Sequence, residues 1–232
     1  MGDAQANAAS DTGLIDRLRR GDPAAATALM QRHNRALWRI ARGILKDEVE
    51  AEDAVQDTYV RALTHIEGFR GGSSLATWLS RIAVNEALRR LGQRKPSVGL
   101  DDVADRLIAE GPSAFRPADA PDPEREAARR ELRRLVEIAI DELAVPYRAV
   151  FIMRAVEQMS IEETARSLGI PSETVKTRLH RANRCLREKL GGEIAAAIEG
   201  IFPFAGARCH RLQQAVLRRL AEPNTERGPP SG

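Results

Sequence analysis

The segment from Ser160 to Leu190 limits the possible folds of this chain more than any other part of the sequence. Ser160 and Glu163 are spaced as in a capping box, and Ser172 is expected to cap a second helix. Between the two helices, Gly169 suits a turn with left-handed backbone. The buried side of the second helix is predicted to carry Val175, Leu179, Ala182 and Leu186. This pattern is typical of a helix-turn-helix, and a plain helical hairpin is the alternative.

The opposite side of that second helix is polar and basic. From the N-terminal half of the helix, such side chains can reach bases and phosphates in the major groove of DNA. The candidate DNA-binding residues are Ser172, Thr174, Lys176, Thr177, His180, Arg181 and Arg184.

Residues 69–91 predict a glycine-containing loop followed by an amphipathic helix. Its core side carries Leu75, Leu79, Ile82 and Ala83. A neighbouring side carries a polar stripe of Trp78, Arg81, Asn85 and Arg89. An aromatic ring, an amide and two guanidinium groups can together hold unstacked bases and the adjoining phosphates. Taken alone, the pattern also fits a core tryptophan beside solvated arginines.

Residues 47–57 contain six acidic residues and no basic residue, so this segment cannot be a DNA-binding face. A helix is predicted from Glu50 to about Thr64, and its buried stripe is Ala51, Ala54, Val55, Thr58, Ala62 and Leu63. The polar residues that project away from this stripe are Glu52, Asp53, Gln56 and Asp57. They are candidates for docking a basic protein surface, and a merely solvated face is the alternative.

Charge is distributed unevenly along the chain, although the net value is only +3. Residues 73–95 carry five basic residues and one acidic residue, and residues 172–190 carry six basic and two acidic residues. Between them, residues 96–123 carry six acidic residues, two arginines and five of the twelve prolines. Two basic blocks separated by an acidic, proline-rich linker indicate two contacts with one polyanion.

The composition excludes several classes of protein. The sequence lacks strand-like runs of Val, Ile and Thr, which predicts an all-α fold. It also lacks a signal-peptide pattern and an apolar stretch of membrane-spanning length, so we expect a cytoplasmic protein without membrane insertion. Cys185 and Cys209 lack a CxxC spacing and predict no metal site. Without a di-metal Glu-x-x-His motif, a phosphate-binding glycine loop or a paired nucleophile, we expect neither enzymatic activity nor a cofactor.

Three stretches, in this order, resemble the extracytoplasmic-function (group IV) sigma factors of bacterial RNA polymerase, a branch of the sigma-70 family. They are EAEDAVQDTYVRAL (50–63), FRGGSSLATWLSRIAVNEALRR (69–90) and MSIEETARSLGIPSETVKTRLHRA (159–182). The resemblance extends over roughly residues 12–190. It implies a protein that binds core RNA polymerase, directs it to specific promoters and helps open the minus-ten element. It further implies a stress or envelope response under the control of an anti-sigma factor.

The resemblance also implies roles for individual residues. The acidic helix matches the segment that grips the clamp helices of the largest polymerase subunit, and another subunit would hold the upstream domain. Phe69, Arg70 and Gly71 lie in the loop that closes over a flipped minus-ten base, and Asn85 matches a residue that contacts this element. The helix-turn-helix matches the reader of the minus-thirty-five element. His180 stands where other members often carry a larger apolar or aromatic residue.

The expected architecture is all-α, with two small helical domains and a C-terminal helical extension. Sigma region 2 is assigned to residues 12–95, a flexible linker to 96–123, sigma region 4 to 124–190 and the extension to 191–232. The extension should add a packing helix with Cys209, Leu212, Val216 and Leu220 on one side, but it could instead pack on the second domain or engage a regulator. A helix-turn-helix regulator with an N-terminal sensing domain, or an adaptor that binds only proteins, is the alternative function.

Overall fold

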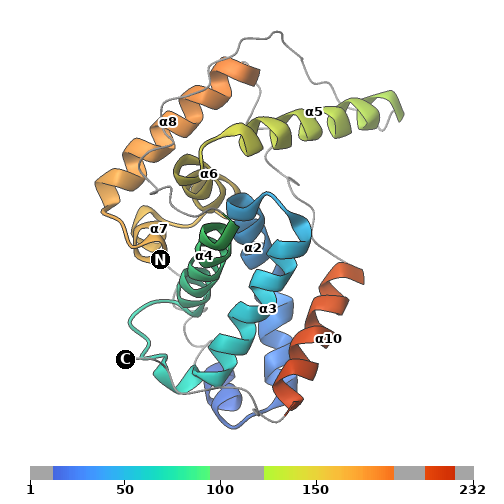
Figure 1. Ribbon diagram of the computed structural model, residues 1–232, viewed down its shortest axis with the longest axis vertical. Helices are drawn as coiled ribbons and strands as arrows, with labels where there is room; N and C mark the ends of the chain where they lie inside the picture. Colours follow the sequence, from blue (N-terminus) through green and yellow to red (C-terminus); the bar gives the residue numbers. More distant parts are fainter. Residues whose placement is uncertain (1–12, 95–122, 191–206, 223–232) are drawn as a thin grey trace.

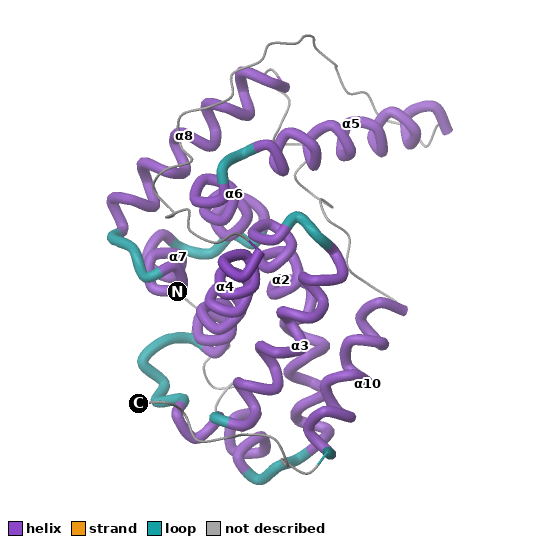
Figure 2. The backbone as a smooth tube through the Cα atoms, viewed as in Figure 1, coloured by secondary structure: helices purple, strands orange, loops and turns teal. Residues whose placement is uncertain are grey.

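Helices joined by loops make up the described part of the protein, as the sequence predicts (Figure 1). The computed structural model describes residues 13–94, 123–190 and 207–222, and Figure 2 shows no strand within these ranges. The predicted linker, except for Pro123, lies outside the described residues, as do residues 1–12, 191–206 and 223–232.

The N-terminal bundle contains residues 13–19, α2 (Pro23–Leu45), α3 (Glu48–Thr64), a 3-10 turn (Ile66–Gly68) and α4 (Leu75–Arg94). Asp22 caps α2, because its Oδ1 accepts the N–H of Ala24 at 2.9 Å. The apolar sides of α2, α3 and α4 meet in one core around Trp38 and Tyr59, which are both almost fully buried. The predicted stripe of α3 therefore faces α2 and α4, and its charged side faces outward.

The C-terminal domain contains α5 (Pro123–Glu142), α6 (Val145–Phe151), a π-helical turn η2 (Ile152–Val156), α7 (Ile161–Leu168) and α8 (Ser172–Leu190). Val136 and Ile140 of α5 are buried, whereas Leu135 is 45% exposed. The N-terminal part of α5 extends away from the rest of the domain (Figure 1).

The helix-turn-helix is formed by α7 and α8. The predicted capping box is present, since Ser160 Oγ accepts the N–H of Glu163 and the Glu163 carboxylate accepts the N–H of Ser160. Gly169 ends α7 with a φ of 66°, the left-handed conformation that the turn requires. Ser172 is the first helical residue of α8 and not its cap, because the Pro171 carbonyl already accepts the N–H of Val175.

The two domains pack against each other through α2 and α4 on one side and α6, η2 and α7 on the other. Arg42 of α2 makes a bidentate pair with Asp141, with N–O distances of 2.9 and 2.7 Å. Arg39 pairs with Glu157 at 3.1 Å, and both side chains are largely buried. Gly43 permits the close crossing of α2 and η2, because a Cβ at this position would lie 2.8 Å from Ile152 Cγ1.

The last described helix, α10 (Ala207–Ala221), packs on the N-terminal bundle. It lies beside α3 and α2, on the side of the bundle away from the helix-turn-helix (Figure 1). Leu212 and Val216 of α10 are fully buried in this contact. The expectation of an extra packing helix is confirmed, but the partner is the first domain and not the second.

His33 of α2 should make the stability of the fold depend on pH. Burial, with a smaller effect of Arg32, lowers the pKa of its imidazole from 6.5 to about 4. Between about pH 6.5 and pH 4, His33 takes up a proton in the unfolded chain but not in the folded chain. This histidine therefore does not lower the free energy of unfolding above about pH 6.5. As the pH drops from there toward 4, the free energy of unfolding should fall by up to about 1.4 kcal/mol per pH unit.

Urea denaturation at about pH 7 and about pH 5 measures this loss. His33→Gln should flatten the dependence. His65→Gln, at an exposed histidine of the same bundle, should leave it as in the wild type. An equal slope in His33→Gln and the wild type would assign the pH dependence to other groups.

Candidate nucleic-acid interface and protein-docking surface

The outer face of α8 carries the side chains that the sequence predicts to contact DNA. Those that are exposed are Lys176, Thr177, His180, Arg181 and Arg184, while Ser172 and Thr174 are partly exposed. The inner face is buried through Val175, Ala182 and Leu186, so the predicted division of the helix is confirmed. Lys176 pairs with Glu173 at 2.7 Å, and this hydrogen bond raises the pKa of the Lys176 ammonium.

Arg181 is held at the base of this face by α6. Its guanidinium donates to the Tyr147 hydroxyl at 2.9 Å and lies 6.0 Å from the centre of the Tyr147 ring. By contrast, Arg187 donates to the Asn183 carbonyl within α8. The tyrosine thus restricts the rotamers of Arg181, a contact between two helices that the spacing of α8 alone does not contain.

The loop before α4 brings Phe69 and Trp78 together. Their ring centroids are 5.3 Å apart, and Phe69 is only 7% exposed, whereas Trp78 remains partly exposed. Arg70 and Gly71 are exposed in the loop, and Gly71 has a φ of 72°. Phe69 therefore supports the inner side of Trp78 and leaves the other candidates of this loop facing solvent.

The first turn of α4 contacts α7 directly. Ser74 caps α4 by accepting the N–H of Thr77 at 3.2 Å, and the Thr77 hydroxyl donates to Glu163 at 3.2 Å. Burial opposes ionisation of Glu163, but hydrogen bonds from Ser160 and Thr77 keep its pKa below the ordinary value. The helix that carries the predicted base-binding stripe is therefore joined to the helix-turn-helix in this arrangement.

Farther along α4, Arg81 and Asn85 are exposed, and the exposed Arg89 is held by a buried partner. Arg89 donates to the carboxylate of Glu86 at 3.0 Å, and Glu86 is 3% exposed and also accepts from Arg61 at 2.5 Å. Sequence reasoning did not single out Glu86. The signal was present, because an acidic residue stands three positions before an arginine in an otherwise basic helix.

The four acidic-face candidates of α3 differ in their environment. Asp53 keeps a half-exposed carboxylate, and Gln56 is partly exposed. Glu52 and Asp57 are each only 20% exposed, because arginines of α10 and α4 pair with them. Burial opposes ionisation of Asp57, but hydrogen bonds from Arg90 and Arg219 outweigh it and hold the pKa of the carboxyl below its ordinary value.

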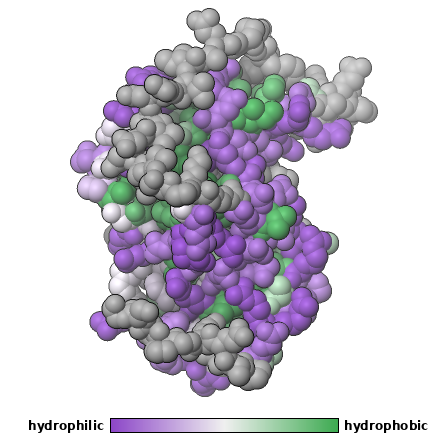
Figure 3. Space-filling view, in the orientation of Figure 1, coloured by the Kyte–Doolittle hydropathy of each residue, from purple (hydrophilic) through white to green (hydrophobic). Residues whose placement is uncertain are grey.

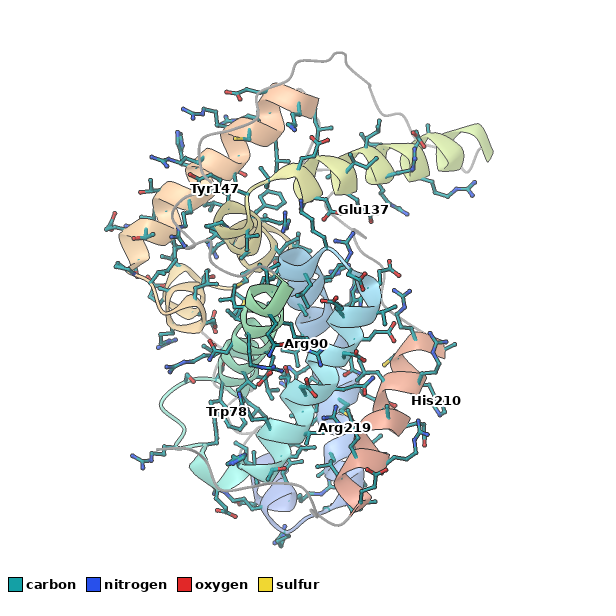
Figure 4. The ribbon with its side chains drawn as sticks, viewed as in Figure 1. Trp78, Arg90, Glu137, Tyr147, His210 and Arg219 are labelled. Carbon is teal, nitrogen blue, oxygen red and sulfur yellow. The ribbon has the colours of Figure 1, made fainter. Side chains whose placement is uncertain are left out.

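Two arginines of α10, Arg208 and Arg219, were not among the predicted site residues. Arg208 pairs with Glu48 at 2.5 Å and Glu52 at 3.0 Å, and Arg219 pairs with Asp57 at 2.7 Å. Figure 4 shows Arg219 on the side of α10 that faces α3, with His210 on the outer side. Both arginines border the apolar stripe of α10, which was the available signal that they face the contact.

Hydrophilic side chains cover most of the described surface in the view of Figure 3. No described helix combines the length and the apolar character needed to cross a membrane. Within the described ranges, no group of three or more His, Cys, Asp or Glu side chains is arranged to hold a metal ion. Cys209 contacts Asn34 instead, with its Sγ 3.1 Å from Nδ2.

The fold is that of a two-domain helical protein with a helix-turn-helix, α7 and α8, in its second domain. Residues 29–96 match the family model for sigma-70 region 2, and residues 133–186 match the model for sigma-70 region 4. The chain is 31% identical over 178 residues to the ECF RNA polymerase sigma factor SigW of Bacillus subtilis, covering 76% of this chain and 94% of that protein. This chain therefore belongs to the sigma-70 family, in its extracytoplasmic-function group.

Other relatives have the same extent of similarity. The RNA polymerase sigma-H factor of Pseudomonas aeruginosa is 31% identical over 183 residues, covering 78% of this chain and 93% of its own length. Among solved structures, CnrH in complex with the cytosolic domain of CnrY matches with a TM-score of 0.52 and 29% identity. That match covers 75% of this chain and 92% of CnrH. These relatives are covered almost completely, whereas about a quarter of this chain has no counterpart in them.

Proposed function

We propose that this protein is a sigma factor that uses three surfaces in succession. The acidic face of α3 binds the clamp helices in the largest subunit of core RNA polymerase. The outer face of α8 reads the minus-thirty-five element, while another polymerase subunit holds its domain. The stripe on α4 captures bases of the minus-ten element as the promoter opens. The protein has no catalytic role of its own.

The observation that carries the proposal is the presentation of the α4 stripe next to an acidic helix. Trp78, Arg81 and Asn85 keep exposed surface on one side of the bundle, and Asp53 and Gln56 do so on the neighbouring helix α3. A repressor needs only the helix-turn-helix, whereas a stripe with a partly exposed aromatic ring and an exposed amide suits DNA whose bases have left the stack. A basic surface of polymerase would complement the carboxylates of α3.

The test is reconstitution with bacterial core RNA polymerase on a library of promoters. The complex should initiate transcription from specific members, whereas the free protein should bind duplex DNA weakly and without strong preference. Asp53→Lys combined with Gln56→Lys should reduce core binding, because both side chains are accessible on α3. Specific repressor-like binding by the free protein, without promoter-specific transcription, would favour the helix-turn-helix regulator.

Arg181→Ala should change the preferred minus-thirty-five sequence by about tenfold in relative promoter strength, since one base-edge contact discriminates by roughly 1–3 kcal/mol. Arg187→Ala should scale all promoters equally, because Arg187 lies farther along α8, where the helix leaves the duplex. Transcription from templates randomised over this element measures both effects.

Tyr147→Phe is the matched test of how Arg181 is positioned. It removes the hydroxyl that accepts from Arg181 but retains the ring. We expect a smaller change in the same direction as Arg181→Ala. A uniform loss on all promoters in Arg181→Ala would make this arginine a phosphate contact and not a base reader.

We also infer that the protein is regulated by an anti-sigma factor in a stress or envelope response. The inference is supported by the likeness to CnrH, which was solved bound to the cytosolic domain of another protein. Purification of the chain from its native cells under non-inducing conditions should recover such a partner in a stoichiometric complex.

A further inference from the structure

The helix α10 covers part of the face of α3 that is proposed to bind polymerase. Arg208 and Arg219 lie eleven positions apart on α10, a span of about 16 Å in a helix. They pair with carboxylates near the two ends of this face, at Glu48 and Glu52 for Arg208 and at Asp57 for Arg219. The same acidic residues cannot pair at the same time with a basic surface of another protein.

The contact is a fitted interface and does not consist of ion pairs alone. Leu212 and Val216, between the two arginines in sequence, are at most 1% exposed. The Arg208 guanidinium lies 5.2 Å from the centre of the Trp38 ring on α2. Cys209 lies against Asn34 of α2, which is itself 1% exposed. The helix is thus seated on α2 and α3 by apolar, aromatic and charged contacts together.

The contact can nevertheless be displaced. Partly exposed ion pairs contribute little individually, and α10 presents few large apolar side chains to the bundle. Attachment to the same chain compensates, because tethering raises the effective concentration of a segment to about the millimolar range. Asp53 and Gln56 remain accessible beside α10, so a basic partner can make its first contact there.

From these contacts we propose that α10 is a built-in competitor of core RNA polymerase for the acidic face of α3. The proposal rests on the function proposed above for that face. When α10 is seated, its arginines pair with Glu48, Glu52 and Asp57, and Asp57 is paired with Arg90 of α4 as well. Core polymerase, with its basic surface, binds after displacing α10. The relatives reported above match only part of this chain, and the competitor is a property of this chain's own residues.

The first test weakens α10 without removing it from the full-length chain. Arg208→Glu combined with Arg219→Glu replaces attraction to α3 with repulsion and should increase the apparent affinity for core polymerase by about five- to tenfold, because apparent affinity scales with the fraction of open molecules. The matched control, Arg211→Glu with Arg218→Glu, makes the same charge change on exposed positions of α10. Neither of these two arginines forms an ion pair with a described residue, and this control should bind as the wild type does.

The second test locks α10 in place. Asn34→Cys, in a Cys185→Ser background, places a second thiol against Cys209, and a disulfide would join α2 to α10. The oxidised protein should bind core polymerase at least tenfold more weakly than the same protein after reduction, since the open state is then nearly unpopulated. Reduction serves as an internal control, because it restores the open state without another change of sequence.

The outcomes separate this proposal from the proposed function. If the Arg208/Arg219 variant binds as the wild type does while Asp53→Lys with Gln56→Lys still weakens binding, the acidic face is the polymerase site and α10 does not compete. If neither variant changes binding, the polymerase site itself is assigned wrongly. Weaker binding by a folded Arg208/Arg219 variant would make α10 a contributor to the polymerase contact and overturn the proposal. Circular dichroism verifies that each variant is folded. Equal binding of core polymerase by the oxidised and the reduced Asn34→Cys variant would also refute the proposal.

Discussion

Arg148→Met should lower the free energy of unfolding by about 3–5 kcal/mol, because it leaves several buried carbonyl groups without a donor. Arg148 is 1% exposed and crosses from α6 to the C-terminal end of α2. It donates to the carbonyls of Gly43, Ile44, Asp141 and Leu143. The last carbonyls of a helix lack partners within that helix, so a guanidinium at this end satisfies them and also complements the helix dipole.

The guanidinium remains charged in this site. Burial lowers the pKa of Arg148 to about 10, which is still well above neutral pH. Methionine fills much of the same volume but supplies no N–H group. The loss of stability in Arg148→Met therefore comes mainly from the lost hydrogen bonds and less from a cavity. Lysine retains the charge but cannot reach carbonyls from two segments with one planar group, so Arg148→Lys should lose a large part of the same stability.

Denaturation in urea, followed by circular dichroism, measures the loss. Arg134→Met is the control, since Arg134 on α5 is exposed and its pair with Glu131 is also exposed. That variant should change the stability by no more than about 0.5 kcal/mol. A similar small effect of Arg148→Met would mean that the junction between the two domains contributes little to the fold.

Asn85→Ala and Trp78→Ala should reduce promoter opening by roughly ten- to a hundredfold, because each contact with an unstacked base is worth about 1–3 kcal/mol. The initial binding of the polymerase complex to duplex promoter DNA should change much less, since the bases are still stacked at that stage. Permanganate footprinting of the minus-ten region reports the opening directly, and a filter-binding assay reports the initial complex.

Of the two variants, Asn85→Ala isolates the base contact better. Asn85 is exposed on α4, whereas Trp78 also packs on Phe69 and so contributes to the bundle. A stability measurement of Trp78→Ala is therefore needed beside the footprint. Gln31→Ala, an exposed amide on α2, is the matched control. Normal opening with Asn85→Ala would remove this residue from the proposed base-binding stripe.

The proposed contacts with an open promoter also require the two domains to move apart. The minus-ten and minus-thirty-five elements are separated by about 25 base pairs, or about 85 Å of duplex at 3.4 Å per base pair. In the arrangement described here, Thr77 of α4 contacts Glu163 of α7. The proposed binding of the α4 stripe and of the outer face of α8 to these two elements therefore requires contacts such as this one to break.

Much of this architecture could be predicted from local patterns. The capping of α2 by Asp22, the capping box at Ser160 and the left-handed Gly169 depend on neighbouring residues, so their sequence signals are sufficient. The buried stripe of α3 followed from helical periodicity, and α3 begins at Glu48, two residues before the predicted start. The exposed positions of α8 followed from the same rule. Ser172 differs from its predicted capping role because α8 begins one hydrogen bond earlier, at the Pro171 carbonyl.

The sequence by itself thus determined which residues form helices and which side of each helix is apolar, because both depend on spacing within about two turns. Only the tertiary structure decided what lies against the polar sides. Arg148 reaches the end of a helix about a hundred positions earlier, and Arg219 reaches Asp57 over more than a hundred and fifty positions. Such contacts depend on how whole helices dock, which is set by the burial of their combined apolar surfaces. For this reason the acidic face of α3 was evident from sequence, whereas its coverage by α10 was not.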